Sequence, residues 1–238
     1  KLALAAAGVG IASVPRRGGA SSVSVIGIAG VVGVLVAMLA MGEGFQATLK
    51  GTGSDEAAII LRGGSQVETN SVISRNQAPL IVGLPGIARS ADGRPLASPE
   101  VSQVVNLPSK ADGTDANVQM RGVGDEGWEV RPHMRLVQGR RFERGLREIV
   151  VGQGVSAQYR GVEVGKTLRL GNEDWTVVGV FASGDSHDSE MWTDAQTLAS
   201  FYRRPAYQSV TVRLDGKDGF AQLKAALDDD PRLKLDAL

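Results

Sequence analysis

The sequence contains no cysteine and carries no net charge. The absence of cysteine excludes disulfides, thiolate metal ligands and cysteine nucleophiles. Lys plus Arg and Asp plus Glu both number 26, so no overall field attracts nucleic acid or an anionic substrate. Nucleic acid is therefore not an expected partner. The length of 238 residues suits one sizeable domain or two small ones.

The strongest single signal is the apolar run from Val23 to Met41, in which Ser24 is the only polar side chain. As a helix this run would rise about 28 Å, close to the roughly 30 Å hydrocarbon thickness of a bilayer. Buried core helices usually have shorter apolar runs, so we predict a transmembrane helix over residues 23–41. Residues 1–22 are then a cytoplasmic or interfacial segment.

The charges that flank this run predict its orientation. Arg16 and Arg17 precede it, whereas Glu43 follows it and the next basic residue is Lys50. By the positive-inside rule the N-terminal flank is cytoplasmic, and the chain from Gly42 onward is extracytoplasmic. A cleaved signal peptide is the main alternative, although its apolar region is normally shorter and ends at a cleavage site of small residues.

Four small residues of the span, Gly30, Gly33, Ala37 and Ala40, share one side of the predicted helix. At about 100° per residue they lie within a sector of about 80°. Such a stripe allows close packing against another helix in lipid. Because glycine is common in membrane helices, chance placement is the alternative.

The rest of the chain predicts an α+β domain of two subdomains. Strand-like runs in the order β-α-β-β, then β-α-β, flank a more strand-rich region. We assign the split α+β part to residues 42–127 and 205–238, and the β-rich insert to residues 128–204. A short or kinked helix is expected over Ser71 to Val82, because Pro79 lies within it. Residues 89–100 are expected to form a mobile linker.

Three motifs resemble ligand-binding or catalytic signatures, but their spacing or the predicted elements around them do not fit those signatures. Gly161 to Thr167 reads GVEVGKT, one residue short of a phosphate-binding loop, and a strand rather than a helix follows it. Ile149 to Ala157 contains GxGxxA without a full βαβ unit. Ser186 to Glu190 reads SHDSE and predicts a solvated turn, and nothing in the sequence brings His133 and His187 together. We therefore predict no catalytic, cofactor-binding or metal-binding residues.

Two segments resemble MacB/FtsX-type ABC transporter permeases. The first is the span with its flanks, RRGGASSVSVIGIAGVVGVLVAMLAMGEGF, and the second is residues 139–181. In the second segment the matching residues are mostly glycines, aromatics and strand positions, namely Gly139, Arg140, Phe142, Glu148, Gly152, Gly161, Gly165, Trp175, Gly179 and Phe181.

The resemblance implies a non-catalytic permease subunit in the bacterial inner membrane, with its main domain in the periplasm. Its expected partners are a cytoplasmic ABC ATPase subunit, a second permease copy or homologue, membrane lipid and a periplasmic adaptor. The ATPase would hydrolyse ATP, and the permease would relay the conformational change across the membrane to export or extract cargo. Three further membrane helices are expected after this domain, so the chain is expected to be part of a longer protein.

Two other functions remain open from the sequence. A single-span sensor or ligand-binding module would need the anchor but not the stripe of small residues. A periplasmic hydrolase with an uncleaved anchor would use His187 or the neighbouring acids.

Overall fold

The computed structural model describes residues 18–52, 56–230 and 232–238. The chain folds as two units, residues 1–52 and residues 53–238. In chain order the elements are α2 (Gly18–Thr52), β1 (Ala57–Arg62), η2 (Glu68–Asn70), β2 (Ile73–Ser74), α3 (Ala78–Val82), β3 (Ala97–Pro108), β4 (Asp115–Val123), α4 (Gly127–Val130), β5 (Arg135–Gly139), β6 (Glu148–Gly152), α5 (Gln153–Gln158), β7 (Thr167–Leu170), β8 (Glu173–Ala182), η3 (Ser186–Ser189), β9 (Glu190–Asp194), α6 (Ala195–Phe201), β10 (Ala206–Tyr207), β11 (Ser209–Arg213), α7 (Gly219–Asp229) and β12 (Leu235–Ala237).

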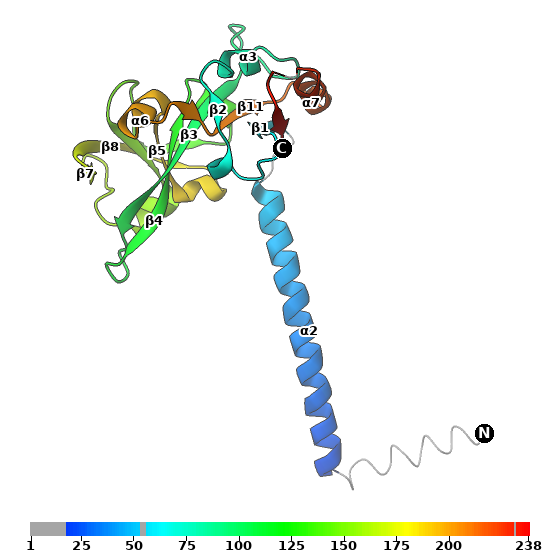
Figure 1. The fold of residues 1–238 in the computed structure, drawn as a ribbon. Helices are drawn as coiled ribbons and strands as arrows, with labels where there is room; N and C mark the ends of the chain where they lie inside the picture. The colour runs from blue at the N-terminus through cyan, green and yellow to red at the C-terminus, as the bar shows by residue number, and fades with distance from the viewer. Residues whose placement is uncertain (1–17, 53–55, 231) are drawn as a thin grey trace. The chain divides into compact units, whose positions relative to one another are not determined.

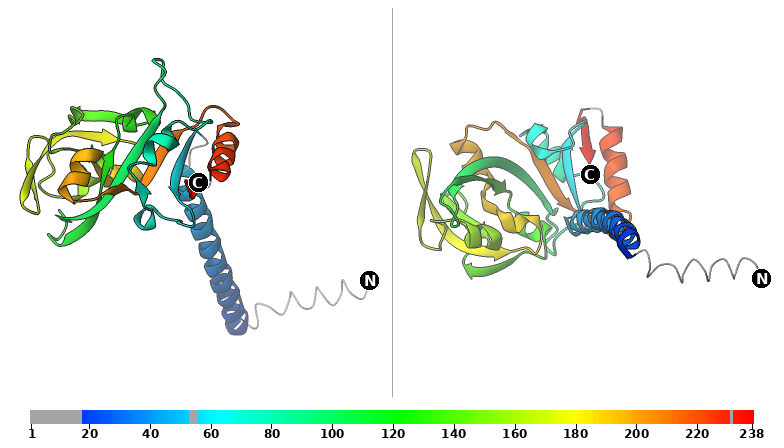
Figure 2. Two further views of the ribbon diagram at one scale, coloured as in Figure 1. Left: turned by 45° about the horizontal axis from the view of Figure 1, so that its top comes forward. Right: turned by 90° about the horizontal axis from the view of Figure 1, so that it is seen from below.

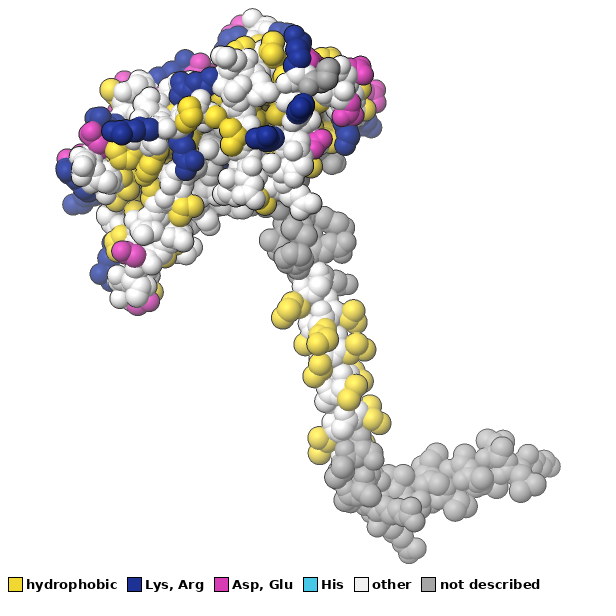
Figure 3. Space-filling model, in the orientation of Figure 1, with side chains coloured by type: hydrophobic (Ala, Val, Ile, Leu, Met, Phe, Trp, Pro, Cys, Tyr) yellow, Lys and Arg dark blue, Asp and Glu magenta, His cyan; other side chains and the backbone are white. Residues whose placement is uncertain are grey.

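The first unit contains one long helix, α2, which continues beyond the apolar run (Figure 1). Its 35 residues span about 52 Å at about 1.5 Å per residue. Within it, Val25–Gly42 has a mean hydropathy of 2.5, and none of these residues is buried by the rest of the chain. Apolar side chains project from this stretch in Figure 3. By length and composition it is the one helix among the described residues that could cross a membrane.

The second unit is built on a ten-stranded sheet. The strands follow the order β12-β1-β11-β3-β4-β9-β6-β8-β5, and β7 also pairs with β8. Pairing is antiparallel except between β4 and β9 and between β6 and β8. β3 is long enough to pair with β11 through residues 97–100 and with β4 through residues 101–108. Figure 2 shows α7 and the C-terminus together at one end of this domain.

The strands of the two predicted parts occupy different stretches of the sheet. β1, β3, β4, β11 and β12 come from the predicted split part, and β5 to β9 come from the predicted insert. The parallel pairing of β4 with β9 joins them into one sheet. The fold is therefore α+β as expected, whereas the subdomain boundaries at 127/128 and 204/205 stay a prediction.

Both faces of the sheet are covered at β6, all five of whose residues are buried. Ile149 and Val151 join the large core cluster. Val150, which points to the opposite face, packs in a second cluster with Phe181 and Trp192. A strand buried on both faces reads as a continuous apolar run, as the residues IVV of β6 do.

Two expectations about local structure are wrong. Residues 71–82 do not form one helix: Ile73–Ser74 form β2, which pairs with β10, and helix begins only at Ala78. Pro79 lies in the first turn of α3, where its missing N–H costs nothing. Residues 89–100 are not a linker, because a hydrogen-bonded turn closes between Ser90 and Arg94 and residues 97–100 belong to β3.

Candidate functional site

The most concentrated group of buried charges surrounds Arg121 of β4. Its guanidinium donates to both carboxylate oxygens of Glu190 at 2.8 and 2.9 Å, and to both oxygens of Glu68 at 2.7 and 2.9 Å. It also donates to Glu100 at 2.8 Å. The Arg121 side chain is 6% exposed. Burial of a guanidinium is tolerated here because every charged group around it is paired and hydrogen-bonded.

A second arginine, Arg131, extends this network. It donates to the two oxygens of Glu100 at 2.7 and 3.0 Å and to the Thr211 hydroxyl at 3.1 Å. Burial by itself would raise the pKa of Glu100, but the charges of Arg131 and Arg121 lower that pKa to about 2. Glu100 is therefore an anion at neutral pH although its side chain is 1% exposed.

The network connects the two predicted parts of the domain. Glu68, Glu100 and Arg121 lie in the split part, on η2, β3 and β4. Arg131 and Glu190 lie in the insert, after α4 and at the start of β9. Bidentate contacts of this kind hold the elements in fixed positions, and each of the five residues is hydrogen-bonded to at least one of the others. We name these five residues the junction network.

Sequence patterns did not single out the junction network. Arg121 carries no such signal, because in NVQMRGV it lies on the polar side of the alternation with Asn117 and Gln119, yet its side chain is buried. The carboxylates come from positions 68, 100 and 190, and only the tertiary fold brings them together.

The two histidines meet at Asp185, which sequence reasoning did not anticipate. His133 Nε2 lies 3.1 Å from Asp185 Oδ2, and His187 Nδ1 lies 2.8 Å from Asp185 Oδ1. Burial opposes ionisation of Asp185, but hydrogen bonds from His187 and Ser183 lower its pKa. This turn is thus partly buried rather than solvated.

The residues of this turn are not arranged as a catalytic triad. The Asp188 carboxylate accepts the backbone N–H groups of Ser183 and Gly184 at 2.7 and 3.1 Å, which is a structural role. Within residues 56–230 and 232–238, no serine hydroxyl contacts either imidazole, so the base-to-nucleophile contact of a triad is not formed. The described residues also contain no group of three or more His, Cys, Asp or Glu side chains placed to hold a metal ion.

The glycine motifs also build ordinary turns. Gly161 and Gly165 have φ of 78° and 87° and lie in the turn region before β7. Gly152 joins β6 to the six-residue helix α5, and a Cβ there would lie 2.3 Å from the Asp188 carbonyl oxygen. The left-handed backbone explains Gly161 and Gly165, and close packing of the backbone explains Gly152.

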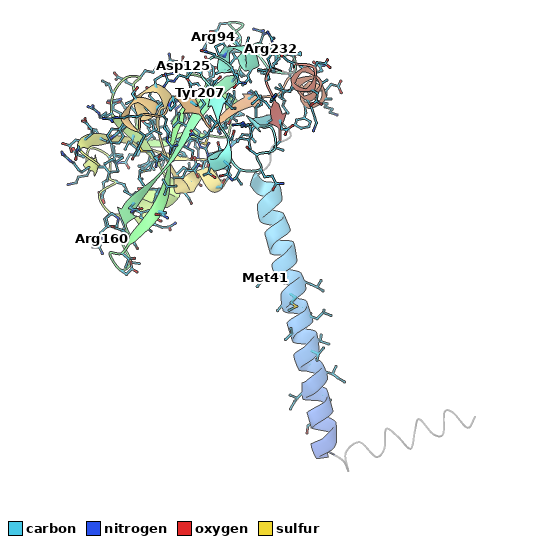
Figure 4. The ribbon with its side chains drawn as sticks, in the orientation of Figure 1. Met41, Arg94, Asp125, Arg160, Tyr207 and Arg232 are labelled. Atoms are coloured by element: carbon cyan, nitrogen blue, oxygen red, sulfur yellow. The ribbon has the colours of Figure 1, made fainter. Side chains whose placement is uncertain are left out.

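A groove of about 1070 Å³ opens beside the junction of the two predicted parts. Asp125 and Tyr207, both labelled in Figure 4, line it together with the loop residues Arg144 and Arg147. Arg144 pairs with Asp125 at 2.5 Å, and Arg147 pairs with Glu173 at 3.2 Å. With charges of both signs paired across its walls, the groove has no clear preference for a ligand of one charge.

The residues predicted for helix packing all lie in the exposed part of α2. Gly30, Gly33, Ala37 and Ala40 are solvent-exposed, as is every other residue of this stretch. An added Cβ at Gly30 or Gly33 would meet no atom of the described residues within 4 Å. The orienting residues Arg16 and Arg17 lie outside the described residues.

Comparison with known proteins identifies the domain. Residues 21–230 match the family described as the MacB-like periplasmic core domain. The fold resembles the extracellular domain of the noncanonic ABC-type transporter YknZ from Gram-positive bacteria, at 16% identity and a TM-score of 0.54 over 76% of this chain and 99% of that one. It also resembles the periplasmic region of MacB from Actinobacillus actinomycetemcomitans, at 15% identity and a TM-score of 0.55 over 80% and 91%. A search of curated proteins found no match.

An apolar helix followed by this domain defines a membrane-anchored protein with an extracytoplasmic domain. The chain belongs to the MacB/FtsX type of ABC transporter permeases. Members of this family are permease subunits of transporters, which implies pairing of permeases and an ATPase partner.

Proposed function

We propose that the chain is a permease subunit that relays ATP-driven conformational change across a bacterial inner membrane to its periplasmic domain. A separate cytoplasmic ABC ATPase subunit would hydrolyse the ATP, and the relayed motion would export or extract cargo. The observation that supports this proposal is that α2 continues without a break beyond its apolar stretch. The helix continues for ten residues past Gly42 to Thr52, and only residues 53–56 separate it from β1.

β1 is well placed in sequence to receive motion from α2. It pairs with β11 on one edge and with β12 on the other. A rotation or shift of α2 would therefore act on a strand that is hydrogen-bonded on both sides. A lone anchor has no comparable need for a helix that continues past the apolar stretch, because a flexible linker tethers a domain equally well.

A second permease copy or homologue is the proposed partner of the stripe formed by Gly30, Gly33, Ala37 and Ala40. Among the described residues nothing fills the space beside Gly30 and Gly33, so a larger side chain there meets no clash with them. Any loss of function on enlargement would therefore come from a neighbouring helix. Lipid surrounds the rest of the span, and a periplasmic adaptor is a further proposed partner of the domain.

The test compares four leucine substitutions in the full-length permease. Gly33→Leu and Ala37→Leu enlarge the stripe, whereas Val34→Leu and Val36→Leu change size outside it. All four keep the span apolar, so membrane insertion should be retained. We expect the ATPase subunit to co-purify with tagged permease, and the two stripe variants to uncouple ATP hydrolysis from transport. Equal activity of all four variants would contradict the proposal that the stripe packs against a neighbouring helix. Absence of the ATPase from the purified permease would favour the single-span sensor.

A further inference from the structure

An exposed arginine-rich segment lies at one edge of the sheet. Residues 135–147, RLVQGRRFERGLR, contain five arginines and one glutamate, a formal charge of +4 in a chain of zero net charge. Twelve of these thirteen residues are solvent-exposed, Phe142 being the exception. We name residues 135–147 the arginine segment.

Two of its arginines have no carboxylate partner within the described part of the chain. Arg140, Arg144 and Arg147 form ion pairs with Glu148, Asp125 and Glu173. Arg135 forms no ion pair there, and Arg141 instead lies over the Trp128 ring, 4.6 Å from its centroid. Stacking on a buried indole holds this guanidinium in place while leaving its N–H groups available.

The same segment presents apolar side chains and a strand edge. Leu136 and Val137 in β5 are 38% and 55% exposed, and Leu146 in the following loop is 46% exposed. Among the described residues β5 pairs with β8 alone, so β5 ends the sheet. Its outer edge carries backbone groups that can accept another strand.

We propose that the arginine segment is a docking surface for an extended acidic segment of another extracytoplasmic protein, which pairs along β5. Carboxylates of that protein would meet Arg135 and Arg141, and its apolar side chains would contact Leu136 and Val137. Anionic lipid is the other chemistry that attracts arginine. The free strand edge favours a polypeptide, because a lipid cannot pair with the backbone along it.

The proposal names a partner for the domain and relies on the proposed function only for placing the segment outside the cytoplasm. Its binding test involves neither ATP nor transport. Failure of the test would thus leave the proposed function standing, and failure of the proposed function would leave a positive binding result standing.

The probe is a labelled twelve-residue peptide of alternating Glu and Val, added to the full chain in nanodiscs of neutral phosphatidylcholine. Anisotropy should report binding that weakens with salt, and a Lys and Val peptide should not bind. Arg135→Ala combined with Arg141→Ala should weaken binding by about fivefold to tenfold. The matched control, Arg62→Ala combined with Arg232→Ala, removes the same charge from exposed arginines elsewhere and should change binding less than about twofold. Arg232 is labelled in Figure 4.

Two further measurements separate the alternatives. A Glu and Val peptide methylated on alternate backbone nitrogens cannot pair fully as a strand and should bind more weakly; equal binding would overturn pairing along β5. Binding of phosphatidylglycerol vesicles that depends on Arg135 and Arg141, without binding of the acidic peptide, would overturn the proposal in favour of lipid. Equal peptide binding by both double variants would overturn it as well, provided that their far-UV circular dichroism is unchanged.

Discussion

At the scale of single residues, Arg121 is the side chain that pairs with all three carboxylates of the junction network. It contacts Glu68, Glu100 and Glu190 through five hydrogen bonds. Removing one partner of a buried ion pair is costly because the remaining charge cannot be solvated. Arg131 would then still pair with Glu100, but Glu68 and Glu190 would lose the guanidinium that pairs with them.

We predict that Arg121→Met lowers the free energy of unfolding by about 3 to 5 kcal/mol. The exposed pair Arg169 and Asp174, 2.9 Å apart, supplies the control, and Arg169→Met should cost less than about 1 kcal/mol. Denaturant unfolding followed by tryptophan fluorescence is suitable, because the three tryptophans are buried in this domain. Similar losses for both variants would show that the junction network contributes no special stability.

The pKa of Glu100 predicts a dependence of stability on pH. Arg131 and Arg121 lower this pKa from 4.5 to about 2 in the folded state. A group with a depressed folded pKa stabilises above its unfolded pKa, and that contribution is lost as pH falls toward the folded value. Unfolding free energy should therefore fall between about pH 4.5 and pH 2. Glu100→Gln should reduce this slope, measured by denaturant titrations across the range, and an unchanged slope would contradict the assignment.

At the scale of elements, β5 is held against β8 by contacts between backbones. Gly139 ends β5 with a φ of 74°, and a Cβ there would lie 2.2 Å from the Val178 carbonyl oxygen. Gly179 on β8 faces the same restriction, since its Cβ would lie 2.4 Å from the Arg140 carbonyl oxygen. These positions explain why glycines of this region resemble the family pattern.

Gly145 offers a matched comparison for Gly139. Its φ is 75°, but a Cβ there meets no atom within 4 Å. Both alanine variants strain the left-handed backbone, by about 1 to 2 kcal/mol. We predict that Gly139→Ala costs an additional 1 to 3 kcal/mol or so, because β5 must shift to relieve the clash. Denaturant unfolding of both variants provides the measurement. Equal losses of unfolding free energy would contradict the prediction, because they would mean that β5 shifts to relieve the clash without destabilising the domain.

Sequence patterns predicted elements with a strong period or a long apolar run. The span, the strands around Ile60 and Val212 and the apolar strand β6 belong to this group. Short elements whose formation depends on distant partners were missed, as with β2, which exists only by pairing with β10. The junction network was missed for the same reason, since its members come from η2, β3, β4, β9 and the end of α4 and meet only in the tertiary fold.

At the scale of the whole molecule, orientation in the membrane determines which proposals can hold. The proposed relay and the proposed docking surface both require the domain to lie outside the cytoplasm. The orientation rests on Arg16 and Arg17 before the span and on Glu43 after it. A sequence without cysteine suits a direct test, because each introduced thiol is the only one within these 238 residues.

We predict that Lys217→Cys, at an exposed position of the domain, reacts with a membrane-impermeant maleimide applied to intact spheroplasts. Ser13→Cys, before the span, should react only after the membrane is permeabilised. Val210→Cys is the control for access within the domain, because Val210 is fully buried and should react only on denaturation. Reaction of Ser13→Cys from outside together with protection of Lys217→Cys would reverse the topology. The arginine segment would then face the cytoplasm, and an extracytoplasmic partner could not reach it.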